Sequence, residues 1–179
     1  LRVKDKEAIR GKLLGLGAIS KGASTNIDHY FTVKHRDFMK TKECLRVREL
    51  PERNISMLTY KPATTRKMED AGFMWKEEME MEVEDGAMMS RILECLGCRK
   101  LATVHKVRKK FGLRGFNVTM DEVKGVGSFM EIEMMGEDVE EAESGMWRII
   151  SELGLSRKDV EAENYRDLVL KASGVYTST

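Results

Sequence analysis

The sequence predicts an α+β protein in which helices pack outside an antiparallel β-sheet. Two observations favour this fold class. Most predicted strands are joined by short loops, whereas parallel strands would need long helical crossovers. Helical segments lie before, between and after the strands, where they can cover one apolar face of a sheet. With 179 residues, 41% of them hydrophobic, the chain can form a core, and we expect one domain over residues 1–179.

Four helices are predicted from apolar residues that recur at helical spacing. The first has Asp5 as its expected N-cap, Ile9 and Leu13 on one face, and Gly17 as its stop. The helices are expected at residues 5–17, 86–97, 138–153 and 159–170, so C-terminal helices occupy about 138 to 170.

Strands are predicted where apolar and polar residues alternate with period two. They are expected at residues 27–33, 45–49, 55–61, 73–85, 101–111, 117–123 and 128–135. In the longest acidic strand, Glu78 and Glu80 fall on one face while Met79 and Met81 fall on the other. The last two strands form a predicted hairpin around residues 124–127.

The overall composition excludes several classes of protein. A net charge of +1 is not that of a globally basic nucleic-acid binder. No apolar run approaches 18 residues, the N-terminus is too charged for a signal peptide, and three cysteines fit a reducing compartment, so we expect a cytoplasmic protein. Cys95 and Cys98 form a lone C-x-x-C, which we interpret as buried cysteines at a helix end.

The charges are sorted by strand. Acidic positions share a face in Glu78/Glu80/Glu82 and Glu131/Glu133, and basic positions share a face in Arg46/Arg48 and Lys106/Arg108/Lys110. A solvated sheet face is one interpretation, but such a face usually mixes the two signs. The alternative is a barrel with a charged interior that a polyphosphate and divalent cations fill. Arg and Lys bind phosphate oxygens, and carboxylates about 7 Å apart on one strand suit Mg²⁺ or Mn²⁺.

Seven segments, in this order and spacing, resemble a known family: His29–Phe31, Arg36–Glu49, Leu58–Lys61, Lys76–Asp85, His105–Phe111, Thr119–Glu133 and Asn164–Val169. The chain resembles the CYTH family, the triphosphate tunnel metalloenzymes named for class IV adenylate cyclase and thiamine triphosphatase. It is most similar to the archaeal and bacterial class IV adenylate cyclase-like subgroup. The resemblance implies an eight-stranded antiparallel β-barrel that encloses a hydrophilic tunnel, with helices outside.

The resemblance also implies the residues of a site. Triphosphate-binding residues would be Arg2, Arg46, Arg48, Lys61, Lys106 and Arg108. Carboxylates that hold Mg²⁺ or Mn²⁺ would be Glu78, Glu80, Glu131, Glu133 and Asp121. Arg2 takes the lysine position of the family motif E-x-E-x-K. Its two glutamates would then lie just before Leu1, outside this sequence, or the protein lacks them, which would favour a phosphate-binding module. The pattern identifies no catalytic nucleophile or base.

We therefore expect a metal-dependent enzyme resembling class IV adenylate cyclase, which converts ATP to cyclic AMP and pyrophosphate. An inorganic or thiamine triphosphatase is the alternative, and a polyphosphate- or RNA-binding module is the non-enzymatic one. RNA binding is less favoured because the basic run 99–114 alternates between two strand faces. The expected partner is a nucleoside triphosphate or inorganic triphosphate, with no membrane, and a homodimer is left open.

Overall fold

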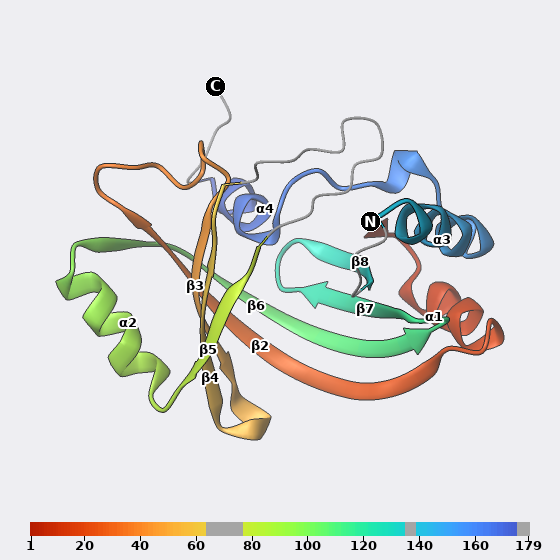
Figure 1. Ribbon diagram of the computed structural model, residues 1–179, viewed down its shortest axis with the longest axis horizontal. Helices are drawn as coiled ribbons and strands as arrows, with labels where there is room; N and C mark the ends of the chain where they lie inside the picture. The colour runs from red at the N-terminus through yellow and green to blue at the C-terminus, as the bar shows by residue number, and fades with distance from the viewer. Residues whose placement is uncertain (64–76, 135–138, 175–179) are drawn as a thin grey trace. The chain divides into compact units, whose positions relative to one another are not determined.

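The computed structural model of the chain describes residues 1–63, 77–134 and 139–174, without the side chains of 139–142 (Figure 1). Its residues fall into two compact units, which we describe one at a time. Unit 1 consists of Leu1–Ser24, Val107–Val123 and Gly127–Ala162. Unit 2 consists of Thr25–Lys106, Lys124–Val126 and Glu163–Thr179. The single domain over residues 1–179 stays a prediction.

Eight strands form one sheet, in the order β1-β8-β7-β6-β2-β3-β4-β5. The strands are β1 (Arg2–Val3), β2 (Ile19–Val33), β3 (Cys44–Leu50), β4 (Ile55–Lys61), β5 (Met79–Val83), β6 (Cys98–Leu113), β7 (Phe116–Val123) and β8 (Gly127–Met134). The pairings of β1 with β8, β2 with β3, β3 with β4, β4 with β5 and β7 with β8 are antiparallel. The predicted α+β class with an eight-stranded antiparallel sheet is confirmed.

Three strands, β2, β5 and β6, differ most in length from their prediction, and β6 spans Cys98–Leu113 rather than 101–111. β2 begins at Ile19, eight residues before the predicted start. The prediction missed this part of the strand because residues 19–23 are exposed and lack the alternation that burial of one face imposes. β5 is limited to Met79–Val83 among the described residues, and the predicted strand residues 73–76 lie outside them.

The helices are α1 (Lys6–Gly15), α2 (Gly86–Cys95), α3 (Val139–Glu152) and α4 (Tyr165–Ala172), close to the predicted ranges. Asp5, Asp85 and Asn164 cap the first, second and fourth through side-chain oxygens that accept backbone N–H groups. Cys95 ends α2, as expected, but it is exposed, so its predicted burial is wrong. The packing face of α2 is formed by other residues, including Gly86 and Ser90. No helix in the described parts of the chain has the length and hydropathy to cross a membrane.

In unit 1 the core lies between the helices α1 and α3 and one face of the sheet. It contains Ile9 and Leu13 of α1, Ile149 of α3, Leu153 directly after α3, and Phe111, Leu113, Phe116, Val118, Met120 and Met130 of the strands. Gly145 allows α3 a close approach, because a Cβ there would lie 2.6 Å from Cζ of Phe116. Since alternate strand residues face this core, Thr119, Asp121 and Glu131 lie on the opposite face.

In unit 2 the helix α2 packs against β3 and β4 on the apolar side of these strands. Gly86 permits this contact, because a Cβ there would lie 2.6 Å from the hydroxyl oxygen of Ser56. The helix α4 is tied to the unit by buried Arg166, which donates a hydrogen bond to the backbone carbonyl of Glu43 at 3.0 Å. The charged face of β3, β4 and β5 is thus the face that α2 does not cover.

Candidate functional site

The register of unit 2 brings the predicted basic and acidic residues onto one face. Asp28 lies directly opposite Arg48, and Arg46 lies opposite Thr59. Thr59 in turn lies opposite Glu80 of β5. Because directly opposite residues of an antiparallel pair share a face, these five side chains form a continuous polar strip.

Asp28 and Arg48 form the most enclosed ion pair of this strip. The Asp28 side chain is 0% exposed, and its two oxygens accept hydrogen bonds from Nε and Nη2 of Arg48 at 2.6 and 2.8 Å. Burial alone would raise the pKa of Asp28, but Arg48, with help from Arg46 and Lys106, lowers it to about 2. Asp28 is therefore ionised at neutral pH.

Arg46 contacts Glu80 of β5 and Glu78, which directly precedes this strand. Its guanidinium is 9% exposed, and Nη2 donates to the Thr59 hydroxyl at 3.1 Å and lies 3.5 and 3.6 Å from carboxylate oxygens of Glu80 and Glu78. Thr59 donates its own hydroxyl to Glu80 at 2.7 Å. Lys61 pairs with Glu78 at 2.9 Å. Each of these two glutamates thus has a cation beside it.

Lys106 is the fourth predicted basic residue in unit 2. It is buried, and its ammonium nitrogen lies 4.8 Å from the centre of the Tyr165 ring in α4. Its charge also contributes to the low pKa of Asp28, so it lies near the Asp28–Arg48 pair. Unit 2 therefore brings together Arg46, Arg48, Lys61 and Lys106 with Glu78 and Glu80, as the resemblance implies.

A second cluster lies in unit 1. Asp121 has a fully buried side chain that accepts from Nε and Nη2 of Arg108 at 2.7 and 2.5 Å. Nη2 of Arg108 also pairs with Glu131 of β8. Glu133, two residues further along β8, is exposed and has no hydrogen bond or ion pair in the described part of the chain. Arg108, Asp121 and Glu131 are thus in direct contact, with Glu133 on the same strand face.

Arg2, the remaining predicted phosphate-binding residue, belongs to unit 1 and already has partners. It donates from Nε and Nη2 to Glu161 at 3.3 and 2.9 Å, and its guanidinium lies 4.9 Å from the centre of the Phe129 ring. Glu161 therefore occupies the edge of the Arg2 guanidinium that Nε and Nη2 form. The roles of all these residues stay predictions.

Sequence reasoning missed three residues of the unit 2 cluster, namely Asp28, Thr59 and Tyr165. Asp28 had a usable signal, because it alternates with Ile27 and His29 in a predicted strand. Thr59 occupies the same face as Lys61, two positions away in β4. Tyr165 had no local signal, because α4 contacts Lys106 across a long stretch of sequence.

The carboxylates have the right chemistry for a hard divalent cation. Among the residues that the structure describes, no group of three or more His, Cys, Asp or Glu side chains is arranged to hold a metal. Mg²⁺, however, usually binds one or two carboxylates and takes its other ligands from water and substrate phosphates. The pairs Glu131/Glu133 and Glu78/Glu80 fit that requirement, whereas both oxygens of Asp121 are taken by Arg108.

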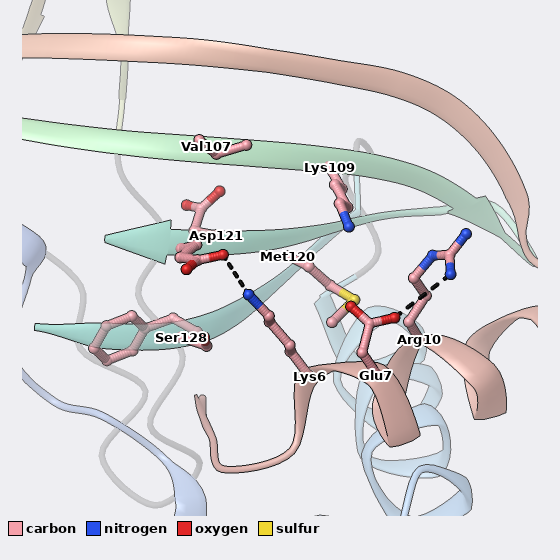
Figure 2. A pocket seen from close by; sticks show the side chains of 10 residues that line it. Lys6, Glu7, Arg10, Val107, Lys109, Met120, Asp121 and Ser128 are labelled. Atoms are coloured by element: carbon pink, nitrogen blue, oxygen red, sulfur yellow. Dashed lines mark hydrogen bonds and ion pairs between the residues drawn. The ribbon is translucent and has the colours of Figure 1, made fainter. Parts of the chain in front are cut away.

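One cavity borders the unit 1 cluster, because Asp121 is among its lining residues, and a second lies away from both clusters. Figure 2 shows the one in unit 1, where Lys6 and Arg10 of α1 approach Lys109 and the strand β7. Its volume of about 30 Å³ is about that of one water molecule in the liquid, too small for a triphosphate. The second, of about 440 Å³, lies in unit 2 beside α2 and is lined by His29 and Glu49, on the outer face of the strands that carry Asp28 and Arg48.

The eight-stranded antiparallel sheet and its face of paired cations and carboxylates define an α+β protein with a strongly charged sheet face. The CYTH domain matches residues 1–165, and the chain belongs to the CYTH family. Putative adenylate cyclase MJ0240 of Methanocaldococcus jannaschii is 28% identical over 171 residues, which cover 94% of each protein.

Solved structures share the fold of this chain. The PH1012 protein of Pyrococcus horikoshii superposes with a TM-score of 0.82 at 29% identity, over 93% of this chain and 94% of that one. The "putative adenylyl cyclase HpAC1" of Hippeastrum, whose structure is said to reveal a dominant triphosphatase activity, has a TM-score of 0.67. At 17% identity, over 97% of this chain and 93% of that one, it shares the fold alone.

Proposed function

We propose that this chain is a metal-dependent enzyme that binds a triphosphate on the charged face of unit 2 and converts ATP to cyclic AMP and pyrophosphate. The observation that carries the proposal is the set of four cationic side chains, Arg46, Arg48, Lys61 and Lys106, gathered on that face. Arg46 and Lys106 are buried, and in such surroundings a cation interacts more strongly with a phosphate than it does in water.

The ion pairs of the unit would be rearranged when substrate binds. Arg46 and Lys61 neutralise Glu78 and Glu80. A triphosphate would draw these two cations to its own oxygens, and the released carboxylates could then face a divalent cation. Bound Mg²⁺ or Mn²⁺ would polarise phosphoryl oxygens and offset the charge of the leaving group.

The chain's own residues supply positioning and charge stabilisation. Arg48 and Arg46 present planar guanidinium groups, which suit two phosphate oxygens at once, and Lys106 presents a point charge. In a cyclase these contacts must hold the α-phosphorus in line with the ribose 3′-hydroxyl. Such positioning, with preorganised cations around the developing charge, is the main source of rate enhancement in phosphoryl transfer.

The register of β1 with β8 supports a position for the glutamates that the resemblance implies before Leu1. Arg2 is opposite Phe129, and Leu1 exchanges backbone hydrogen bonds with Met130. A strand continued upstream in this register would place its next two alternate residues opposite Glu131 and Glu133. An E-x-E pair there would face the two glutamates of β8 and strengthen a metal site in unit 1.

Hydrolysis of a short polyphosphate is the second candidate. All four cations of the unit 2 cluster are groups that bind phosphate, so they suit inorganic triphosphate as well as ATP. The Hippeastrum protein, described by its triphosphatase activity, is similar in fold. The two reactions would use the same phosphate-binding residues. They differ in the nucleophile that attacks phosphorus, which is a ribose hydroxyl in one and water in the other.

The experiment incubates the protein with Mg²⁺ or Mn²⁺ and, separately, with ATP, inorganic triphosphate and thiamine triphosphate, and then separates the products by chromatography. Lys106→Ala tests one of the four cations of unit 2, and Glu131→Gln and Arg108→Ala are the further test variants. Lys109→Ala is the matched control, because it removes the same charge from the next residue of β6, on the opposite face.

Cyclic AMP and pyrophosphate, lost in the test variants and kept in the control, are the expected products. Orthophosphate from inorganic or thiamine triphosphate would favour the second candidate. Tight triphosphate binding without turnover would point to a binding module, and neither binding nor turnover would contradict the proposal.

A further inference from the structure

Asp28 is the most enclosed carboxylate of the unit 2 cluster. Both of its oxygens accept from Arg48, and Oδ2 lies 3.9 Å from Nη1 of Arg46. One buried negative charge therefore contacts two of the proposed phosphate-binding arginines. A buried carboxylate is costly unless it is paired, and these contacts explain how the fold tolerates it.

A negative charge at this place is unexpected in a site for a polyanion. By Coulomb's law alone, Asp28 repels a triphosphate and weakens its binding. A compensating benefit must come from what Asp28 does to the arginines. A free arginine side chain samples many rotamers, and binding a phosphate from that ensemble costs conformational entropy.

The geometry of the pair shows what this benefit is. Asp28 engages Nε and Nη2 of Arg48, which is one whole edge of the guanidinium. A contact through two nitrogens fixes the plane of the group as well as its position. The third nitrogen, Nη1, makes no hydrogen bond in the described part of the chain and belongs to the edge left for another acceptor.

We infer that Asp28 is a positioning residue, which fixes the guanidinium of Arg48, and secondarily that of Arg46, in the orientation that receives the triphosphate. This inference rests on the proposed function, because it assigns the ligand of Arg48 to be a phosphate group. Unit 1 repeats the arrangement, since Asp121 holds Nε and Nη2 of Arg108 in the same way.

The test measures binding of inorganic triphosphate by calorimetry, without metal, to the wild type and to Asp28→Asn. Asparagine keeps the shape of the side chain but cannot accept from both nitrogens with the strength of a carboxylate. The expected result is a dissociation constant raised roughly tenfold, about the effect of one charge-assisted hydrogen bond. Glu49→Gln is the matched control, because it removes one charge beside Arg48 on the opposite face and should leave binding unchanged.

A double-mutant cycle shows whether Asp28 acts through Arg48. Arg48→Lys alone should weaken binding, because lysine cannot be held by the same two contacts. In the Arg48→Lys background, Asp28→Asn is expected to change affinity by less than about twofold. Independent, fully additive losses would overturn the positioning role.

Three outcomes separate this inference from its rivals. Tighter binding by Asp28→Asn would mean that Asp28 acts only by its charge, and a lower melting temperature with unchanged affinity would mean a purely structural role. Either result overturns the inference and leaves the proposed function intact. Absence of triphosphate binding by the wild type would overturn both.

A measurement on the wild type covers the case in which Asp28→Asn does not fold. The Nε–H resonance of Arg48, assigned with Arg48→Lys, reports the hydrogen bond to Asp28 by NMR. We expect this resonance to stay near its position and to remain protected from exchange when triphosphate is added. A large shift, or loss of protection, would mean that substrate breaks the pair and would overturn the inference.

Discussion

The two charged clusters are built around the same contact but carry opposite net charge. In each, a buried aspartate holds Nε and Nη2 of an arginine, Asp28 with Arg48 in unit 2 and Asp121 with Arg108 in unit 1. The remaining members differ. Unit 2 adds three cations (Arg46, Lys61, Lys106) and two carboxylates (Glu78, Glu80), whereas unit 1 adds only two carboxylates (Glu131, Glu133).

This difference suggests that the two clusters bind different ligands. An excess of positive charge in unit 2 favours a polyanion, and an excess of negative charge in unit 1 favours a divalent cation. In each cluster the aspartate would then orient the guanidinium of its arginine, and the surrounding residues would decide which ligand is bound. Three predictions test this comparison, beginning with the largest expected effect.

Removal of divalent metal should have the largest effect, because it should abolish the metal-dependent role proposed for the unit 1 cluster and leave the binding role proposed for the unit 2 cluster. We expect EDTA to lower the turnover of triphosphate by on the order of a thousandfold, because a metal supplies several kcal/mol of charge stabilisation. Binding of triphosphate to the cations of unit 2 should persist, though more weakly. The initial rate and calorimetric binding are measured before chelation, after it, and after Mg²⁺ is restored.

Full activity in EDTA would show that the carboxylates of unit 1 have no metal role. Loss of both turnover and binding would show that the two clusters do not act separately.

The second prediction concerns the ionised state of Asp28. Its pKa of about 2 in the folded protein lies below the ~3.9 of an unfolded chain, because Arg48 offsets the cost of burial. A lowered folded pKa adds stability that is fully present above about pH 4 and is lost as the pH falls through 2. The loss should reach about 2.6 kcal/mol of unfolding free energy between pH 5 and pH 1.

Urea unfolding at pH 5, 4, 3 and 2.5 measures this slope for the wild type and for Asp28→Asn. The variant should be less stable at pH 5 and should lose less stability on acidification, because asparagine does not titrate. Glu49→Gln, an acidic residue of β3 on the other face, serves as the control. Equal acid slopes in the wild type and Asp28→Asn would contradict the ion pair.

Much of the fold follows from local sequence. Alternation with period two located seven of the eight strands and placed Glu78, Glu80, Arg46 and Arg48 on faces that the structure reproduces. It failed at the start of β2, because exposed residues such as Ser20 and Lys21 carry no apolar signal even though they pair in a sheet. Alternation of apolar and polar residues thus predicts a strand only where one face of that strand is buried.

The pairing of charges could not be predicted in the same way. Which carboxylate meets which arginine depends on register, and register is set by the packing of the whole sheet. Asp121 was expected to be a metal carboxylate, yet the structure places both of its oxygens on Arg108. Asp28 passed unnoticed, because its importance comes from lying opposite Arg48 rather than from its neighbours in sequence.

The smallest predicted effect belongs to Glu133, the carboxylate of the unit 1 cluster that has no ion pair among the described residues. Glu133→Gln should raise the metal concentration needed for half-maximal activity on the order of tenfold, because one charged ligand is lost. Triphosphate binding without metal should not change, since the four cations proposed to carry that binding lie in unit 2. Glu122→Gln is the matched control, because Glu122 lies on the outer face of β7, paired with Lys6 at 2.5 Å. A change in metal-free triphosphate affinity, with an unchanged metal requirement, would reverse the roles assigned to the two clusters.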